Sequence, residues 1–136
     1  MIVDTSALMA ILLREPEAAA FTETIVDAPR CALSAGSWIE LTAVLTRGHG
    51  GRKVEAAERL IEKAGIVIEP VTVEQAETGR QAYRRYGIGA GHPARLNFGD
   101  CFAYALARVS GEPLLFKGAD FAQTDIVAAI FTQGTP

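Results

Sequence analysis

Four acidic residues of this sequence stand among apolar or small neighbours rather than on charged helix faces. Asp4 ends an apolar run at the start of the chain, Glu40 lies in a helical stretch with few other charges, and Asp100 opens an apolar helix. Asp120 follows another short apolar run. Because carboxylates are rarely buried without a partner, these four acids are the candidate site residues.

The predicted elements should bring the four acids together. Asp4 and Asp120 each follow a strand. In a parallel sheet, the ends of the strands lie at one edge, and the helices that follow these strands begin at the same edge. Two carboxylates about 4 Å apart repel by roughly 4 kcal/mol at an effective dielectric constant of 20. No arginine or lysine stands beside all four acids, so a divalent cation is the expected neutraliser, and all-oxygen ligation favours Mg²⁺ or Mn²⁺. Such a metal activates water for attack on a phosphodiester.

The elements that must position these acids follow from the hydrophobic pattern. Short apolar runs predict strands at 1–4, 31–33, 66–70 and 113–116, and amphipathic stretches predict helices at 7–14, 17–28, 36–46, 54–64, 73–86 and 99–109. Thr5 or Ser6 is expected to cap the first helix. The apolar run 126–131 is expected to form a fifth strand or a helical turn. This alternation predicts an α/β fold with a mostly parallel sheet of four to five strands and helices on both faces.

Composition sets limits on the class of protein. With 136 residues, 49% of them hydrophobic and 21% charged, the chain fits a single domain spanning 1–136 and is not generally disordered. Two cysteines without CxxC spacing exclude a disulfide scaffold and a thiolate zinc site, and they suit a cytoplasmic location. The apolar stretch near the start is far below the ~20 residues that cross a bilayer, so neither membrane insertion nor secretion is expected. A net charge of −3 argues against binding nucleic acid by bulk electrostatics alone.

Each acid also has a structural interpretation that the sequence pattern leaves open. Asp4 could simply end a strand, and Asp120 could form a turn. Asp100 could complement its helix dipole, which is worth about 0.3–1 kcal/mol. Basic and aromatic residues outside these acids could guide a nucleic acid backbone or could merely face solvent. They are Arg47, Arg52, Lys53, Arg80, Arg84, Arg85 and Arg95, with Tyr83 and Tyr86.

The segments around the four acids also follow a recognisable order. They are residues 2–8 (IVDTSAL), Glu40 within its helix, residues 96–105 (LNFGDCFAYA) and residues 114–121 (LLFKGADF). Together they resemble the motifs of PIN-domain ribonucleases, and in particular the VapC toxins of type II toxin–antitoxin modules. The resemblance covers essentially the whole chain. It implies an α/β/α sandwich and an Mg²⁺- or Mn²⁺-dependent endoribonuclease that cleaves RNA phosphodiester bonds.

The resemblance also implies roles for single residues. Asp4 and Asp100 would be the principal metal ligands. Glu40 would complete the metal site or orient a water-mediated contact. Asp120 would be the more variable fourth acid, so all four acids are predicted to be both metal ligands and catalytic residues.

Further implications concern the neighbours of these acids and the partners of the chain. Thr5 or Ser6 would hydrogen-bond the Asp4 carboxylate or the site water. Many relatives have two acids before the phenylalanine that follows Asp120, where this sequence has an alanine, so Asp125 stays open as a substitute. The resemblance implies RNA as substrate, a homodimer, and a cognate VapB-like antitoxin whose C-terminal segment covers the active site.

Two other classes share parts of the pattern. A magnesium-dependent receiver domain needs paired acids near the first strand and a lysine followed by proline, whereas Lys117 precedes Gly118. A haloacid-dehalogenase-like phosphatase needs a second Asp two residues after the first, where this chain has Ser6. A PIN fold kept only as a binding or dimerisation module is the third alternative. The four acids argue against it, because unpaired buried carboxylates destabilise a fold.

Overall fold

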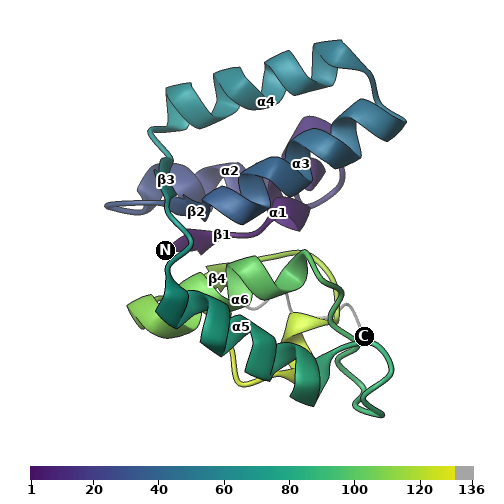
Figure 1. The fold of residues 1–136 in the computed structure, drawn as a ribbon. Helices are drawn as coiled ribbons and strands as arrows, with labels where there is room; N and C mark the ends of the chain where they lie inside the picture. Colours follow the sequence, from purple (N-terminus) through teal and green to yellow (C-terminus); the bar gives the residue numbers. More distant parts are fainter. Residues whose placement is uncertain (131–136) are drawn as a thin grey trace.

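A computed structural model describes residues 1–130, which form a four-stranded sheet with helices on both faces (Figure 1). The strands are β1 (Ile2–Val3), β2 (Ala32–Ser34), β3 (Val67–Glu69) and β4 (Leu114–Leu115). Their order is β3-β2-β1-β4, and each neighbouring pair is parallel. The predicted α/β class and the four predicted strand positions are confirmed, although the strands are shorter than expected.

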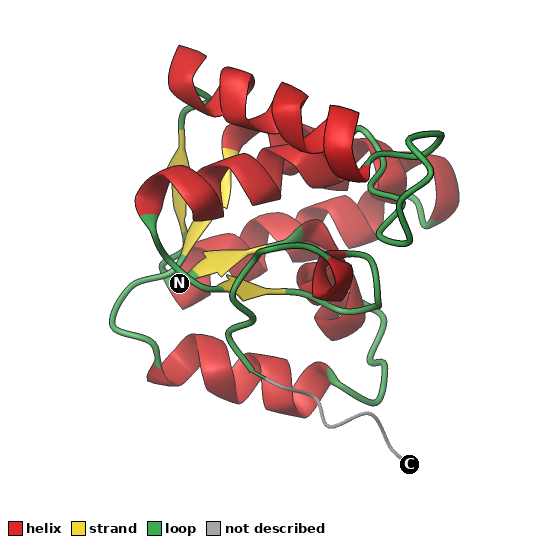
Figure 2. Ribbon diagram, turned by 90° about the horizontal axis from the view of Figure 1, so that it is seen from below, coloured by secondary structure: helices red, strands yellow, loops and turns green. Residues whose placement is uncertain are grey.

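The helices are α1 (Thr5–Leu12), α2 (Ala18–Asp27), α3 (Ala35–Gly48), α4 (Gly51–Ala64), α5 (Val73–Tyr86), α6 (Asp100–Ser110) and the short 3-10 helix η1 (Phe121–Gln123). Figure 1 shows α1 to α4 on one side of the sheet and α5 and α6 on the other. In Figure 2 the strands lie in the middle of the molecule with helices on either side. None of the helices within residues 1–130 is both long and apolar enough to span a bilayer.

The register of the sheet divides the strand residues between two apolar cores. Ile2 lies opposite Ala32 and Leu114, and all three belong to the core on the side of α5 and α6. Val3 and its partner Leu115 belong to the core on the side of α1 to α4. Because successive strand residues point to opposite faces, a strand buried on both sides reads as a continuous apolar run. This explains the apolar runs of β1, β2 and β4, whereas Val67 and Ile68 of the edge strand β3 are apolar although they are exposed.

Two local features differ from the sequence prediction. Asp4, and not Thr5 or Ser6, caps α1, because the Asp4 backbone is extended and its carboxylate accepts a hydrogen bond from the amide of Ser6. Within residues 1–130 the run after η1 forms neither a fifth strand nor a helical turn, since only Ala128 pairs with Leu114, as an isolated parallel bridge. Residue 131 of that predicted run lies outside the described residues.

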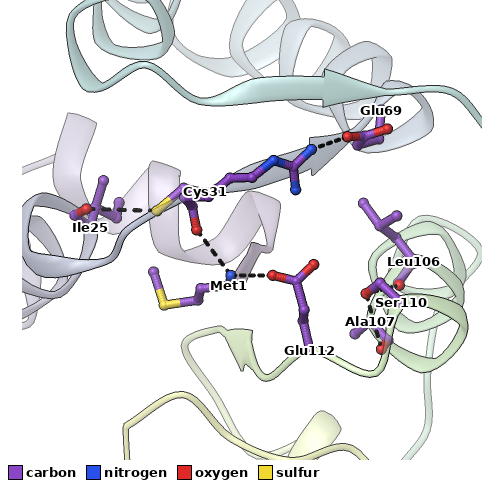
Figure 3. Close-up of polar contacts among 9 residues, drawn as sticks. Met1, Ile25, Cys31, Glu69, Leu106, Ala107, Ser110 and Glu112 are labelled. Atoms are coloured by element: carbon purple, nitrogen blue, oxygen red, sulfur yellow. Dashed lines mark hydrogen bonds and ion pairs between the residues drawn. The ribbon is translucent and has the colours of Figure 1, made fainter.

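The amino group of Met1 holds the start of β1 in place. It donates to the backbone carbonyl of Arg30 at 3.0 Å and to the carboxylate of Glu112 at 2.6 Å, the second of which Figure 3 shows between labelled residues. At the other end of the strand, the amide of Asp4 donates to the carbonyl of Leu115 at 2.9 Å. These contacts fix β1 between its neighbours and thereby fix the position of Asp4.

Candidate active site

Asp4 is the most deeply buried of the four predicted acids, with 3% of its surface exposed. Its Oδ2 accepts hydrogen bonds from the amide (2.9 Å) and the hydroxyl (2.6 Å) of Ser6. Its Oδ1 is buried and has no hydrogen-bond partner within residues 1–130. Burial raises the pKa of Asp4 despite the bonds from Ser6, and the charge of Asp120 raises it further. A buried acceptor without a partner destabilises the fold unless something binds it, so Oδ1 is the atom of Asp4 that is open to a further partner.

Asp100 begins α6 and forms a reciprocal pair with Asn97. Its Oδ2 accepts from the amide of Asn97 at 2.9 Å, and its own amide donates to Oδ1 of Asn97 at 2.9 Å, as in a capping box. Burial and the charges of Asp4, Glu40 and Asp120 together raise the pKa of Asp100 to about 7, although the hydrogen bond from Asn97 acts to lower it. Without a metal, Asp100 therefore holds its proton to a higher pH than an ordinary aspartate.

Glu40 lies in the second turn of α3 and reaches the start of α6. Its carboxylate fills the space beside the Gly99 backbone, where any Cβ would overlap it. Burial raises the pKa of Glu40, the hydroxyl of Thr5 lowers it as a hydrogen-bond donor, and the charge of Asp4 raises it. A glycine at position 99 is therefore what allows Glu40 to lie next to Asp100.

Asp120 and Asp125 lie close in sequence but have different surroundings. Asp120 is exposed at the start of η1, and its charge raises the pKa of both Asp4 and Asp100. Asp125 accepts a hydrogen bond from the hydroxyl of Tyr104 at 2.6 Å and lies 3.7 Å from the guanidinium of Arg108. Because the partners of Asp125 are in the middle and last turns of α6, Asp120 is the better placed of the two to act as the fourth acid.

Thr5 and Ser6 both contact the acids from the first turn of α1. The Thr5 hydroxyl lies between the Glu40 carboxylate and the carbonyl of Ser37, which is 3.4 Å away. The Ser6 hydroxyl donates to Asp4, which is the contact that the family resemblance implied. A catalytic role for either hydroxyl stays a prediction.

The four acids are neighbours, but they do not form a closed cage. The pKa shifts show that Asp4, Glu40 and Asp100 each feel the charge of at least one other acid. Nevertheless, no three His, Cys, Asp or Glu side chains in the described part of the chain lie close enough to enclose a metal ion. The described residues therefore place the four acids near one another without enclosing a site, and their assignment as metal ligands stays a prediction. The oxygen-only donor set and the unpartnered Oδ1 of Asp4 still fit a hard divalent cation.

Two residues that build the site were missed in the sequence. Asn97 precedes Asp100 by three positions, the spacing of a capping box, which could have identified it as the partner of Asp100. Gly99 gave no such signal, because the need for a glycine there comes from Glu40, which is distant in the sequence.

The family of the chain follows from comparisons with known proteins. The sequence profile of the PIN domain matches residues 1–127, and the chain belongs to the PIN-domain family. It is 48% identical over 126 residues to the ribonuclease VapC42 of Mycobacterium tuberculosis (strain ATCC 25618 / H37Rv), which covers 93% of this chain and 96% of that relative. The resemblance to VapC-type PIN ribonucleases is therefore confirmed, and the receiver and phosphatase alternatives lose their support.

Solved structures share the same fold. VapC20 of Mycobacterium tuberculosis, described as a Sarcin-Ricin loop cleaving toxin, matches with a TM-score of 0.74 at 22% identity, covering 93% of this chain and 95% of that chain. A toxin-antitoxin complex from Klebsiella pneumoniae contains a chain that matches with a TM-score of 0.68 at 21% identity, covering 95% of this chain and 97% of that chain. At these identities the likeness establishes the fold.

Proposed function

We propose that this chain is a metal-dependent endoribonuclease and the toxin of a type II toxin–antitoxin module. The observation that carries the proposal is the buried, unpartnered Oδ1 of Asp4 beside two further carboxylates, Glu40 and Asp100, whose pKa values are raised. A binding module without a cation would keep these groups only at a cost in stability. Membership of the PIN-domain family and the name of the relative VapC42 support the same function.

In this proposal the metal ligands are Asp4, Asp100, Glu40 and Asp120. A bound divalent cation would neutralise charge on the phosphate and lower the pKa of a water for attack on phosphorus. The chain itself orients the ligands: Ser6 occupies Oδ2 of Asp4 and leaves Oδ1 for the cation, and Asn97 holds Oδ2 of Asp100. Glu40 would complete the metal site or orient a water.

Proton release accompanies metal binding at this site. Metal ligands must be deprotonated, and the pKa of Asp100 is about 7 when no metal is bound. The Asp100 carboxylate would therefore have to lose its proton before it held a metal, and metal affinity should rise with pH near neutrality. PIN-domain ribonucleases generally use divalent metal ions; for this chain we propose Mg²⁺, with Mn²⁺ as a substitute, because every donor is a carboxylate oxygen.

For partners, we propose RNA as substrate, a VapB-like antitoxin and a second copy of this chain. The toxin-antitoxin complex among the structural neighbours supports the antitoxin. The homodimer is supported by several exposed apolar side chains around the pocket between α5 and α6, namely Val71, Tyr83 and Phe98, because neighbouring exposed apolar groups are typical of protein interfaces. We place the protein in the cytoplasm, where its RNA substrate is found.

The test is cleavage of total cellular RNA by the purified chain, followed by sequencing of the new RNA ends. Wild type should cut RNA with Mg²⁺, EDTA should stop cleavage, and Mn²⁺ should restore it. Asp100→Asn should abolish cleavage and remove growth arrest on expression, whereas the control Asp27→Asn, at an exposed position at the end of α2, should behave as wild type. Metal-independent cleavage, or cleavage by Asp100→Asn at the wild-type rate, would contradict the ligand assignment. A wild type that cuts no RNA would favour the catalytically silent PIN module.

A further inference from the structure

Lys117 is held at both its backbone and its side chain, at the start of the loop that carries Asp120. Its amide donates to the Ser6 hydroxyl oxygen at 3.0 Å. Its ammonium forms ion pairs with Glu15 and with Glu17, whose Oε2 is 3.2 Å away. Both glutamates belong to the segment that joins α1 to α2. One residue thus connects that segment, the first turn of α1 and the loop after β4.

The same contact also fixes the direction of the Ser6 hydroxyl. The Ser6 oxygen accepts from the amide of Lys117, so its single proton is directed to Oδ2 of Asp4, 2.6 Å away. A continuous set of polar contacts therefore runs from the Lys117 ion pairs to the Asp4 carboxylate. It leaves Oδ1 of Asp4 free.

The loop leaves this anchored point through a sharp turn. Gly118 has a φ of +106°, a conformation that L side chains rarely adopt, so the chain changes direction directly after Lys117. Asp120 follows, exposed and without a side-chain hydrogen bond capping η1. Asp120 therefore lies between two fixed points, residue 117 and the buried Phe121, and its position relative to Asp4 depends in part on how firmly residue 117 is held.

We infer that Lys117 is a positioning residue whose two ion pairs hold the loop of Asp120 beside Asp4. The inference rests on the proposed function, in which both aspartates bind the metal. Partly exposed ion pairs contribute little to global stability, and the Lys117 side chain is 36% exposed. Its main effect is therefore local: it holds the start of the loop, while the buried Phe121, which packs against Phe116, holds the end.

Hydrogen exchange of the metal-free chain tests the anchor directly. Lys117→Met keeps the apolar stem and removes the ammonium, and it should accelerate exchange of the Lys117 amide, which the Ser6 hydroxyl protects, about tenfold while leaving the sheet unchanged. Lys117→Arg should restore slow exchange, because a guanidinium can pair with both glutamates. The control is Lys63→Met, which removes an exposed ammonium from the last turn of α4 and should change nothing in this loop.

Calorimetry with Mn²⁺ then tests the effect on the proposed metal site. Lys117→Met should weaken Mn²⁺ binding about tenfold, as loss of an outer-shell partner does. The double variant Glu15→Gln/Glu17→Gln should weaken it equally, and adding Lys117→Met to it should cause no further loss, because the three residues form one unit.

The outcomes separate this inference from the proposed function. If hydrogen exchange in this loop is unchanged in Lys117→Met, Lys117 does not position the loop. The same conclusion follows if exchange becomes faster by the same factor throughout the chain. Both outcomes refute the positioning role whether or not the protein cleaves RNA. If Lys117→Met exchanges faster in this loop but the wild type binds no Mn²⁺, the result supports the anchoring role of Lys117 and refutes the metal site. An unchanged Mn²⁺ affinity in Lys117→Met, with faster loop exchange, would refute the claim that the anchor serves the metal site.

Discussion

The junction between β1 and α1 and the loop between β4 and η1 supply acids to the same edge of the sheet in different ways. Asp4 at the first junction is 3% exposed and accepts two hydrogen bonds from Ser6. Asp120 in the second is exposed and makes no capping hydrogen bond. Both follow parallel strands that are paired to each other. Two acids at similar positions in the topology can therefore differ in how firmly their side chains are held.

This difference suggests a site with a preformed half and an adaptable half. The preformed half contains Asp4, Glu40 and Asp100, whose pKa values are all raised by burial. The adaptable half is the loop of Asp120, which contacts the rest of the site through Lys117. Such a division is consistent with the lack of a closed cage within residues 1–130, since the last ligand would close only around a bound cation.

The largest expected effect compares the two halves directly. Asp4→Asn should reduce RNA cleavage by more than about 100-fold, the upper end for loss of an outer-shell partner, because it removes a preformed ligand. Asp120→Asn should reduce it only about tenfold. Single-turnover cleavage rates at saturating Mg²⁺ measure both. Equal losses in the two variants would show that the halves contribute equally.

A smaller effect is expected from crowding the preformed half. Gly99→Ala places a methyl group where the Glu40 carboxylate lies and should weaken Mn²⁺ binding about tenfold by displacing that carboxylate. The matched control is Gly48→Ala at the end of α3, where a Cβ meets no atom within 4 Å. Calorimetry on both variants decides, and wild-type affinity in Gly99→Ala would mean that Glu40 is not a ligand.

The smallest expected effect is on the pH dependence of stability without metal. Asp100 keeps its proton to about pH 7 in the folded chain but releases it near its ordinary value of 3.8 when unfolded. The native state therefore binds more protons between these values, and the free energy of unfolding should fall as pH rises from about 4 to 7. Asp4 and Glu40 shift in the same direction.

Urea unfolding in EDTA at several pH values measures this slope. Asp100→Asn should flatten it, and Asp27→Asn should not. Saturating Mg²⁺ should stabilise the chain most at the upper end of the range, where the carboxylates are free of protons. A free energy of unfolding that rises with pH in EDTA would contradict the raised pKa values.

Much of this architecture could be predicted from the sequence because its signals are local. Buried strands appear as short apolar runs, and amphipathic stretches located the helices, with α5 matching the predicted range 73–86. Acids such as Asp4 and Asp100 stood out because strand ends and helix starts can be recognised from neighbouring residues. The interpretation of residues 1–136 as a single PIN domain stays a prediction.

The remaining features depend on contacts between distant segments. Asp120 was the predicted fourth acid and Asp125 its possible substitute, and only contacts with distant segments favour Asp120: Asp125 binds Tyr104 and Arg108 of α6, whereas the charge of Asp120 acts on Asp4 and Asp100. The same holds for Lys117, whose partners Glu15 and Glu17 lie about a hundred positions away. Neither residue type nor periodicity can predict such pairs, because many arginines, lysines and acids of this chain could pair on composition alone.

The bonds made by the amino group of Met1 have a practical consequence for expression of this protein. Wherever a peptide precedes Met1, the Met1 nitrogen is an uncharged amide and its ion pair with Glu112 is lost. A purification tag at this end would therefore disturb β1 and, three residues further, Asp4. Low activity in such a fusion would report a displaced strand rather than a poor catalyst.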